Sequence, residues 1–204
     1  MVLQPTIHGN CYSRQKQYSH SYLTSMIATN YPTINLLKLA SSSQWLEQAL
    51  SNMGLILLDH SHCELKAANN AINLMFRYLG HEKLVASMTA IAREELEHFH
   101  QVNQILADRQ IPMATLSSPP YAAALKKQIR SNGQERLLDC LLVGALIEAR
   151  SHERLGLLAA HLPDPDLAGF YRSLMASEAR HFGAFWSLAD TYFERSIEIG
   201  RAHV

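Results

Sequence analysis

The stretch "LVASMTAIAREELEHFHQVNQI", residues 84–105, is the clearest indication of the fold class of this chain. Its apolar residues recur at alternating steps of four and three, the period of an amphipathic α-helix and not of a β-strand. Two polar residues, Glu95 and His98, stand at stripe positions that the neighbouring turns fill with Leu, Ile, Met or Val. The segment therefore predicts a helix that directs a carboxylate and an imidazole into the core, three residues apart.

The rest of the chain shows the same helical period and no alternation typical of strands. We expect long helices over about 44–79, with a break near 51–54, and over 82–108, 136–161 and 167–198. A short helix near 121–130 interrupts the long connection 108–135. Two close connections and one long connection between them predict an all-α, ferritin-like four-helix bundle of two antiparallel hairpins joined by a crossover.

Length and composition limit the classes of protein that fit. Residues 1–42 show no sustained period and are expected to be an extension of uncertain structure, which leaves 43–204 as one domain. The charge balance is 18 basic against 18 acidic residues, so a nucleic acid would have to bind a local patch. The three cysteines are scattered and are expected to be reduced thiols. The sequence shows no membrane span and no signal peptide, so a soluble, cytoplasmic protein is expected. The sequence does not indicate the oligomeric state.

A second carboxylate–imidazole pair, Glu178 and His181, lies on the apolar stripe of the expected helix 167–198. Chance predicts about 0.6 Glu-x-x-His pairs in a chain of this composition, and the sequence has three. The third, Glu97 and His100, shares its face with charged and amide residues and is expected to be solvated. Placement on an apolar stripe, and not the motif alone, selects the other two pairs.

Glu64 and Glu148 complete the set, because each lies on the inward stripe of the helix that precedes a Glu-x-x-His helix. The offsets are similar: 31 residues separate Glu64 from Glu95, and 30 separate Glu148 from Glu178. Four carboxylates and two imidazoles in one interior would be destabilising as bare charges, but they can hold two divalent cations. The oxygen-rich set favours iron over zinc and leaves manganese open. Any one of these glutamates alone would more often be an ordinary residue at the edge of the core.

Several other residues allow both a structural and a functional interpretation. His152 is either a satisfied residue at the core edge or a support for a metal ligand. Glu94, Glu153 and Arg154 are expected to be solvated or to support ligands, and Phe99, Phe182 and Phe185 to pack in the core or line a pocket. Four basic residues in and after the crossover could contact phosphates, although such a cluster is usually only solvated: Lys126, Lys127, Arg130 and Arg136.

Four blocks of the sequence resemble the tRNA hydroxylases of the MiaE family, over about residues 43–195. The blocks are "DHSHCELKAA" (59–68), "IAREELEHFHQV" (91–102), "LLVGALIEARSHERL" (141–155) and "SEARHFGAF" (177–185). The resemblance implies that six residues are iron ligands, the same six that the stripes select: Glu64, Glu95, His98, Glu148, Glu178 and His181.

The resemblance also implies an activity. A member would be a di-iron monooxygenase that hydroxylates the isopentenyl side chain of 2-methylthio-isopentenyl-adenosine in tRNA, with dioxygen as co-substrate and electrons from an external donor. Nothing in the periodicity indicates tRNA, so this expectation comes from the resemblance alone. Two alternatives stay open: another ferritin-like oxidase, such as a peroxide-reducing or aldehyde-processing enzyme, and a non-catalytic iron-binding bundle.

Overall fold

The computed structural model describes residues 34, 36–117 and 120–193. Every regular element in this part of the chain is an α-helix, and the described residues form no strand. The helices are α2 (Ser43–Ser51), α3 (Met53–Arg77), α4 (Glu82–Asp108), α5 (Pro120–Lys126), α6 (Gly133–His161) and α7 (Pro165–Tyr192).

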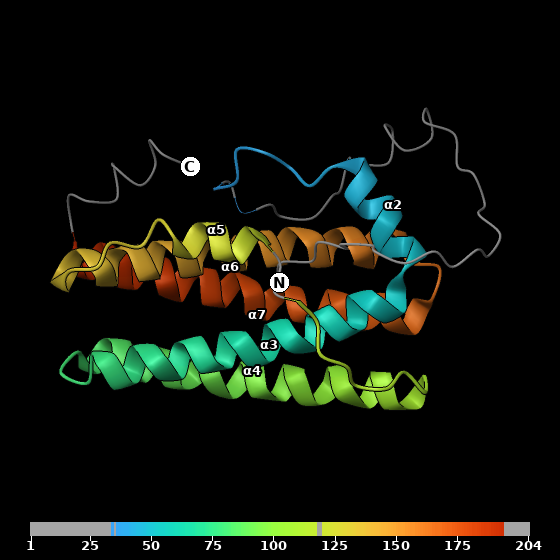
Figure 1. Ribbon diagram of the computed structural model, residues 1–204, viewed down its shortest axis with the longest axis horizontal. Coiled ribbons are helices and arrows are strands. Elements are labelled where there is room, and N and C mark those ends of the chain that lie inside the picture. Colours follow the sequence, from blue (N-terminus) through green and yellow to red (C-terminus); the bar gives the residue numbers. More distant parts are fainter. Residues whose placement is uncertain (1–33, 35, 118–119, 194–204) are drawn as a thin grey trace.

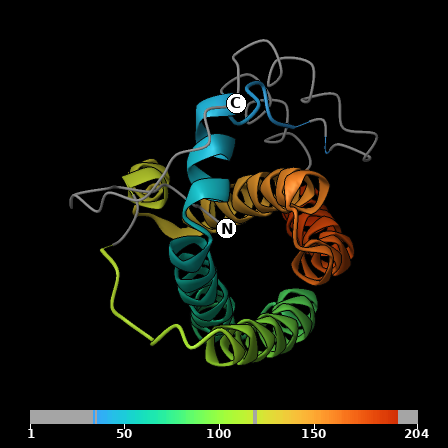
Figure 2. The same ribbon diagram turned by 90° about the vertical axis from the view of Figure 1, so that its right-hand side faces the viewer.

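Four long helices form the bundle. α3 packs along α4, and α6 along α7, so each short connection closes an antiparallel hairpin (Figure 1). The crossover after α4 returns along the outside of the bundle and carries α5 onto α6, so α6 runs parallel to α4 and antiparallel to α3 (Figure 1). The end-on view shows the four helices around one common centre (Figure 2). The predicted all-α bundle of two hairpins and a long crossover is confirmed.

The helix ends follow local sequence signals. The predicted break near 51–54 is confirmed, since α2 ends at Ser51 and α3 begins at Met53. α7 begins two residues earlier than expected because Asp164 caps it, accepting hydrogen bonds from the backbone N–H groups of Asp166 and Leu167. Pro165 occupies the first turn, where its missing N–H is not needed. The expected end of this helix at 198 lies outside the described residues.

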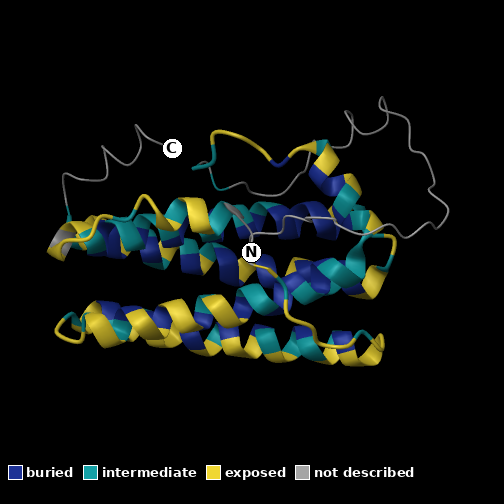
Figure 3. Ribbon diagram, viewed as in Figure 1, coloured by how far each residue is buried: buried dark blue, intermediate teal, exposed yellow. Residues whose placement is uncertain are grey.

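The interior is divided along the bundle axis. One apolar cluster, around Leu57, Val102 and Leu155, lies towards the end where α2 packs, and a second, around Met88, Leu141 and Leu188, lies towards the other end. Buried residues follow the inner faces of all four helices (Figure 3). Between the two clusters the same inner faces carry buried Glu and His, so the polar residues form a band at the middle of the bundle.

A polar network fastens the segment before α2 to α6. Ser41 donates from its backbone N–H to Glu153 Oε1 at 2.6 Å and from its hydroxyl to Glu153 Oε2 at 2.9 Å. Arg154 donates to the Ser41 hydroxyl at 3.1 Å, and its guanidinium lies 4.6 Å from the centre of the Trp45 ring. The prediction that Arg154 is solvated is therefore wrong, because its side chain is buried and positions α2.

None of the helices described by the structure combines the length and the apolar character that crossing a membrane requires. The division of the chain at residue 42 stays a prediction, because most of the segment before it lies outside the described residues.

Candidate metal centre

The structure brings the six predicted side chains together from four helices at the middle of the bundle. They form two overlapping groups, one of Glu64, Glu95, His98 and Glu178, the other of Glu95, Glu148, Glu178 and His181. Within each group one donor atom of every residue lies within 4.8 Å of the others, and all six residues are buried. Glu95 and Glu178 belong to both groups. This arrangement suits two cations that share two carboxylates, and we call them the Glu64–His98 and the Glu148–His181 positions.

Several atoms of the cluster lack hydrogen-bond partners, which supports a site for cations. Three of its atoms are buried and make no hydrogen bond within the described part of the chain: Glu64 Oε2, His98 Nδ1 and His181 Nδ1. His181 Nδ1 lies 3.0 Å from Glu95 Oε1, and His98 Nδ1 lies 3.5 Å from Glu64 Oε2, yet neither pair has hydrogen-bonding geometry. Buried polar atoms normally find partners. Here the unpartnered donor atoms surround a common point, and bound cations would supply the missing partners.

The charges of the cluster also call for cations. The pKa of Glu148 is raised well above its usual range, because burial disfavours the charged form and Glu178 and Glu95 repel it. Burial and the neighbouring Glu64 raise the pKa of Glu95 in the same way. Burial would lower the pKa of His98, but its contacts with Glu64 and Glu95 outweigh this and raise the pKa to about 10. Without metal, this interior would hold protons in place of cations.

His60 is a residue of the centre that the sequence reasoning missed. Its Nε2 lies 2.6 Å from Glu64 Oε1, and its side chain is 0% exposed. Burial would raise the pKa of Glu64, yet contacts with Glu95, His60 and His98 lower it. The spacing of four residues, which places His60 one helical turn before Glu64, was the signal that could have identified it.

Each metal-facing histidine is also held from its other nitrogen. His181 Nε2 donates to Glu94 Oε2 at 3.0 Å, and Arg180 donates to the same oxygen at 2.9 Å. His98 Nε2 lies 3.3 Å from the hydroxyl of Ser177. Such contacts fix the tautomer and the orientation of a ligating imidazole. Of the two roles expected for Glu94, the structure supports that of a carboxylate that orients His181.

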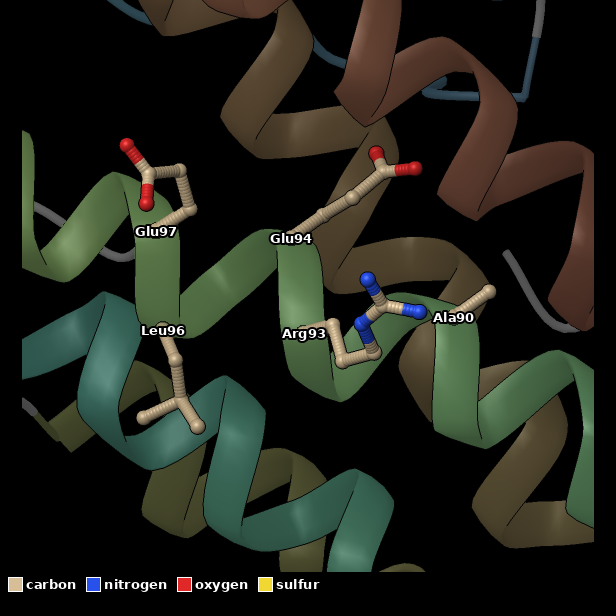
Figure 4. A pocket seen from close by; sticks show the side chains of 5 residues that line it. All are labelled: Ala90, Arg93, Glu94, Leu96 and Glu97. Carbon is tan, nitrogen blue, oxygen red and sulfur yellow. The ribbon is translucent and has the colours of Figure 1, made fainter.

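The outward face of α4 meets the centre at Glu94, which accepts a hydrogen bond from His181. A hollow on this face is lined by Ala90, Arg93, Glu94, Leu96 and Glu97 (Figure 4). Glu94 and Leu96 leave the helix on different sides (Figure 4). Glu97 and His100 are exposed, as predicted for this third Glu-x-x-His pair. Glu97 contacts Gln101, and His100 contacts Gln104, along the helix surface.

The remaining candidates are not brought into the cluster. His152 is buried, which lowers its pKa, and it belongs to neither group. Phe182 stacks on Trp186, and the Phe185 ring packs against Gly144. Among the four basic residues, Lys126 and Lys127 are exposed on and just after α5, Arg130 is paired with Asp139 and Glu135, and Arg136 is half-buried.

The chain matches known proteins over most of its length. A family described as "tRNA-(MS[2]IO[6]A)-hydroxylase (MiaE)" matches residues 28–202. A "tRNA 2-(methylsulfanyl)-N(6)-isopentenyladenosine(37) hydroxylase" of Pseudomonas putida is 40% identical over 163 residues, 78% of this chain and 79% of the relative. A protein of the same name from Salmonella typhimurium is 31% identical, with 83% and 82% of the two chains covered.

A solved structure is also similar. "Protein 43 with aldehyde deformylating oxygenase activity from Synechococcus" has a TM-score of 0.79 and 47% identity, and the match covers 82% of this chain and 84% of that one. The family match spans all four bundle helices and therefore includes the whole Glu/His cluster. The fold, the cluster and these similarities agree, and the chain belongs to the MiaE family of tRNA hydroxylases.

Proposed function

We propose that this protein is a di-iron monooxygenase that hydroxylates the isopentenyl side chain of 2-methylthio-isopentenyl-adenosine in tRNA. The observation that carries the proposal is the buried cluster of four carboxylates and two imidazoles in a member of the MiaE family. Both curated relatives are named as hydroxylases of this nucleoside. A tRNA substrate also implies that the reaction takes place in the cytoplasm.

Six side chains would hold the two iron ions. Glu64 and His98 would bind one ion, Glu148 and His181 the other, and Glu95 and Glu178 would bridge them. When bound, the iron pair would supply the activation of dioxygen: one oxygen atom is inserted into a C–H bond, and the other is reduced to water by electrons from an external donor. Manganese fits the same oxygen-rich set, so metal analysis of purified protein has to establish the identity of the ions.

The protein's own contribution is to orient the ligands and to exclude water. Every ligand stands on a long helix whose inner face is packed on both sides of the polar band, so the backbone that carries it has little freedom to move. Glu94 and Ser177 hold the two imidazoles with Nδ1 towards the centre. The apolar clusters at both ends keep bulk solvent from the reacting atoms.

The substrate would have to present one base to a site inside the bundle. The modified adenosine would leave the anticodon stack, as enzymes that act on a base generally require. Lys126 and Lys127 are exposed and could contact the tRNA backbone. Arg130 and Arg136 are the weaker candidates, since Arg130 already pairs with Asp139 and Glu135 and Arg136 is half-buried.

The proposal is tested by incubating iron-loaded, reduced protein with oxygen and tRNA that carries the unhydroxylated nucleoside. Mass spectrometry of the digested nucleosides should show the gain of one oxygen on the isopentenyl group. The Glu148→Ala variant should give no product, and Glu97→Ala should act like the wild type. Absence of product with a full iron pair and a working reductant would contradict the proposal.

A second candidate, an oxygenase acting on aldehydes, is favoured by the 47% identity to the solved protein with aldehyde deformylating oxygenase activity. The same reduced protein offered a long-chain aldehyde in place of tRNA separates the two. Loss of the aldehyde carbon, without hydroxylation of tRNA, would replace the first proposal. Iron binding with neither product would indicate a non-catalytic iron-binding bundle.

A further inference from the structure

We propose that His60 holds Glu64 ready to bind, so that the Glu64–His98 position takes up its metal ion first and binds it more tightly than the Glu148–His181 position. The inference rests on the proposed metal centre and adds an order of filling to it. It concerns a feature in which the two halves of the centre differ, the support of their unshared carboxylates.

Glu64 is held in one orientation. His60 Nε2 contacts Oε1 at 2.6 Å, which leaves Oε2 directed at His98 Nδ1, 3.5 Å away. The imidazole is itself packed: it is 0% exposed and stacks on Tyr171 with ring centres 5.5 Å apart and planes at 26°. A carboxylate fixed by a packed partner loses less conformational entropy when it binds a cation.

Glu148 lacks this support. The two hairpins repeat one plan, so the residue four before Glu148, Gly144, corresponds to His60. The Phe185 ring fills that space, with its nearest atom 2.7 Å from where a side chain would begin at Gly144. No donor within the described part of the chain makes a hydrogen bond to Glu148, and its nearest imidazole contact is His181 Nδ1 at 3.9 Å. Its carboxylate must be oriented by the metal itself.

Support of the imidazoles favours the opposite order but is the weaker effect. His181 has a carboxylate behind it, Glu94, whereas His98 has only the hydroxyl of Ser177. The Glu94 side chain is 39% exposed, and Arg180 shares its oxygen at 2.9 Å. Solvent and the arginine therefore screen its charge. The His60–Glu64 contact acts on an anionic ligand and is buried on both sides, with side-chain exposures of 0% and 4%.

The order of filling is measured by anaerobic calorimetry of the metal-free protein, with Fe(II) as the probe and Mn(II) as a redox-inactive second probe. The wild type should bind two ions in two resolved steps. His60→Leu keeps the packing volume but removes the donor, and it should weaken the tight step about 10- to 100-fold without changing the weak one. His60→Gln, whose amide can replace Nε2 as a donor, should restore most of that loss. His100→Leu, the same change at an exposed histidine of α4, should leave both steps unchanged.

Two further variants identify the steps even where His60→Leu does not fold, which circular dichroism would show. Glu148→Ala should keep the tight step and lose the weak one, and Glu64→Ala should do the reverse. Loss of the tight step in Glu148→Ala, or an unchanged tight step in folded His60→Leu, would overturn the inference. A wild type that binds no metal would instead refute the metal centre and the proposed function.

Discussion

Glu148 shows how much one buried carboxylate requires of its surroundings. It is 5% exposed, receives no hydrogen bond from the described residues and faces two other carboxylates. An unpaired buried charge costs several kcal/mol, and neutralisation by a proton or a cation is the usual solution. The inward position of this glutamate is therefore a functional signal that packing alone does not explain.

Replacing Glu148 by Ala should remove one of the two metal ions and leave the helical content nearly unchanged, because a small residue is tolerated in a helix and a repulsive charge is lost. Metal analysis after anaerobic loading, together with circular dichroism, measures both quantities. Glu97→Ala, on the exposed face of α4, is the matched control and should retain two ions. Equal metal contents in the two variants would contradict the assignment of Glu148.

Gly144→Ala should destabilise the fold by about 1–3 kcal/mol, because the added methyl group meets the Phe185 ring and forces it to move. Denaturant unfolding measures the difference. Gly169→Ala in α7 is the control, since nothing lies within 4 Å of its new methyl group. That change should stabilise the helix by up to about 1 kcal/mol. Equal effects at the two glycines would show that Phe185 adjusts without cost.

Among the elements, the crossover is where sequence reasoning was least complete. Its basic residues suggested a phosphate-binding patch, but Arg130 donates through its side chain and its backbone N–H to Asp139, at the start of α6. This contact fastens the end of the crossover to the bundle. It gives Arg130 a structural role that the residue would have to give up to bind RNA.

Asp139→Asn should lower the melting temperature by a few degrees at most at neutral pH. Burial alone would raise the pKa of Asp139, but the hydrogen bonds from Arg130 outweigh it and lower the pKa. The contribution is therefore present above the ordinary value of 3.8 and is lost as the pH falls through the lowered value. Melting curves from pH 7 downwards measure this: the difference in melting temperature between variant and wild type should vanish below the lowered pKa of Asp139. Asp190→Asn, which also removes one carboxylate but on the exposed face of α7, is the control and should leave the melting temperature at neutral pH nearly unchanged.

Across the whole molecule, the metal centre would join the two hairpins. Contacts within each hairpin are far more extensive than those between hairpins, where α4 and α7 meet. The proposed ligands come from all four long helices, so two bound ions would link α3 and α4 to α6 and α7. Metal binding should consequently affect the stability of the whole bundle.

Removal of metal with a chelator should lower the melting temperature, and Fe(II) or Mn(II) should restore it. A ligand present at 100 times its Kd stabilises the folded state by about 2.7 kcal/mol, and each kcal/mol shifts the melting temperature of a chain this long by about 2–4 °C. The variant Glu95→Gln, which alters a carboxylate common to both groups, should reduce the metal-dependent shift strongly. A melting temperature independent of metal would argue against ions at this centre.

The sequence by itself determined the helices, their order and the six inward polar residues. Periodicity reports which face of a helix is buried, and six polar residues on apolar stripes therefore indicated a common interior. It also separated Glu97 and His100 from the other pairs, because their face is polar throughout.

Only the tertiary structure decided which residues act together across helices. It showed that Glu95 and Glu178 belong to both groups, that His60 supports Glu64, and that Glu94 holds His181. It also showed that Arg130 is paired with Asp139 and that Arg154 is buried. The physical reason is that the rotation and depth of each helix against its neighbours are set by side-chain packing, and spacing along one chain does not report them.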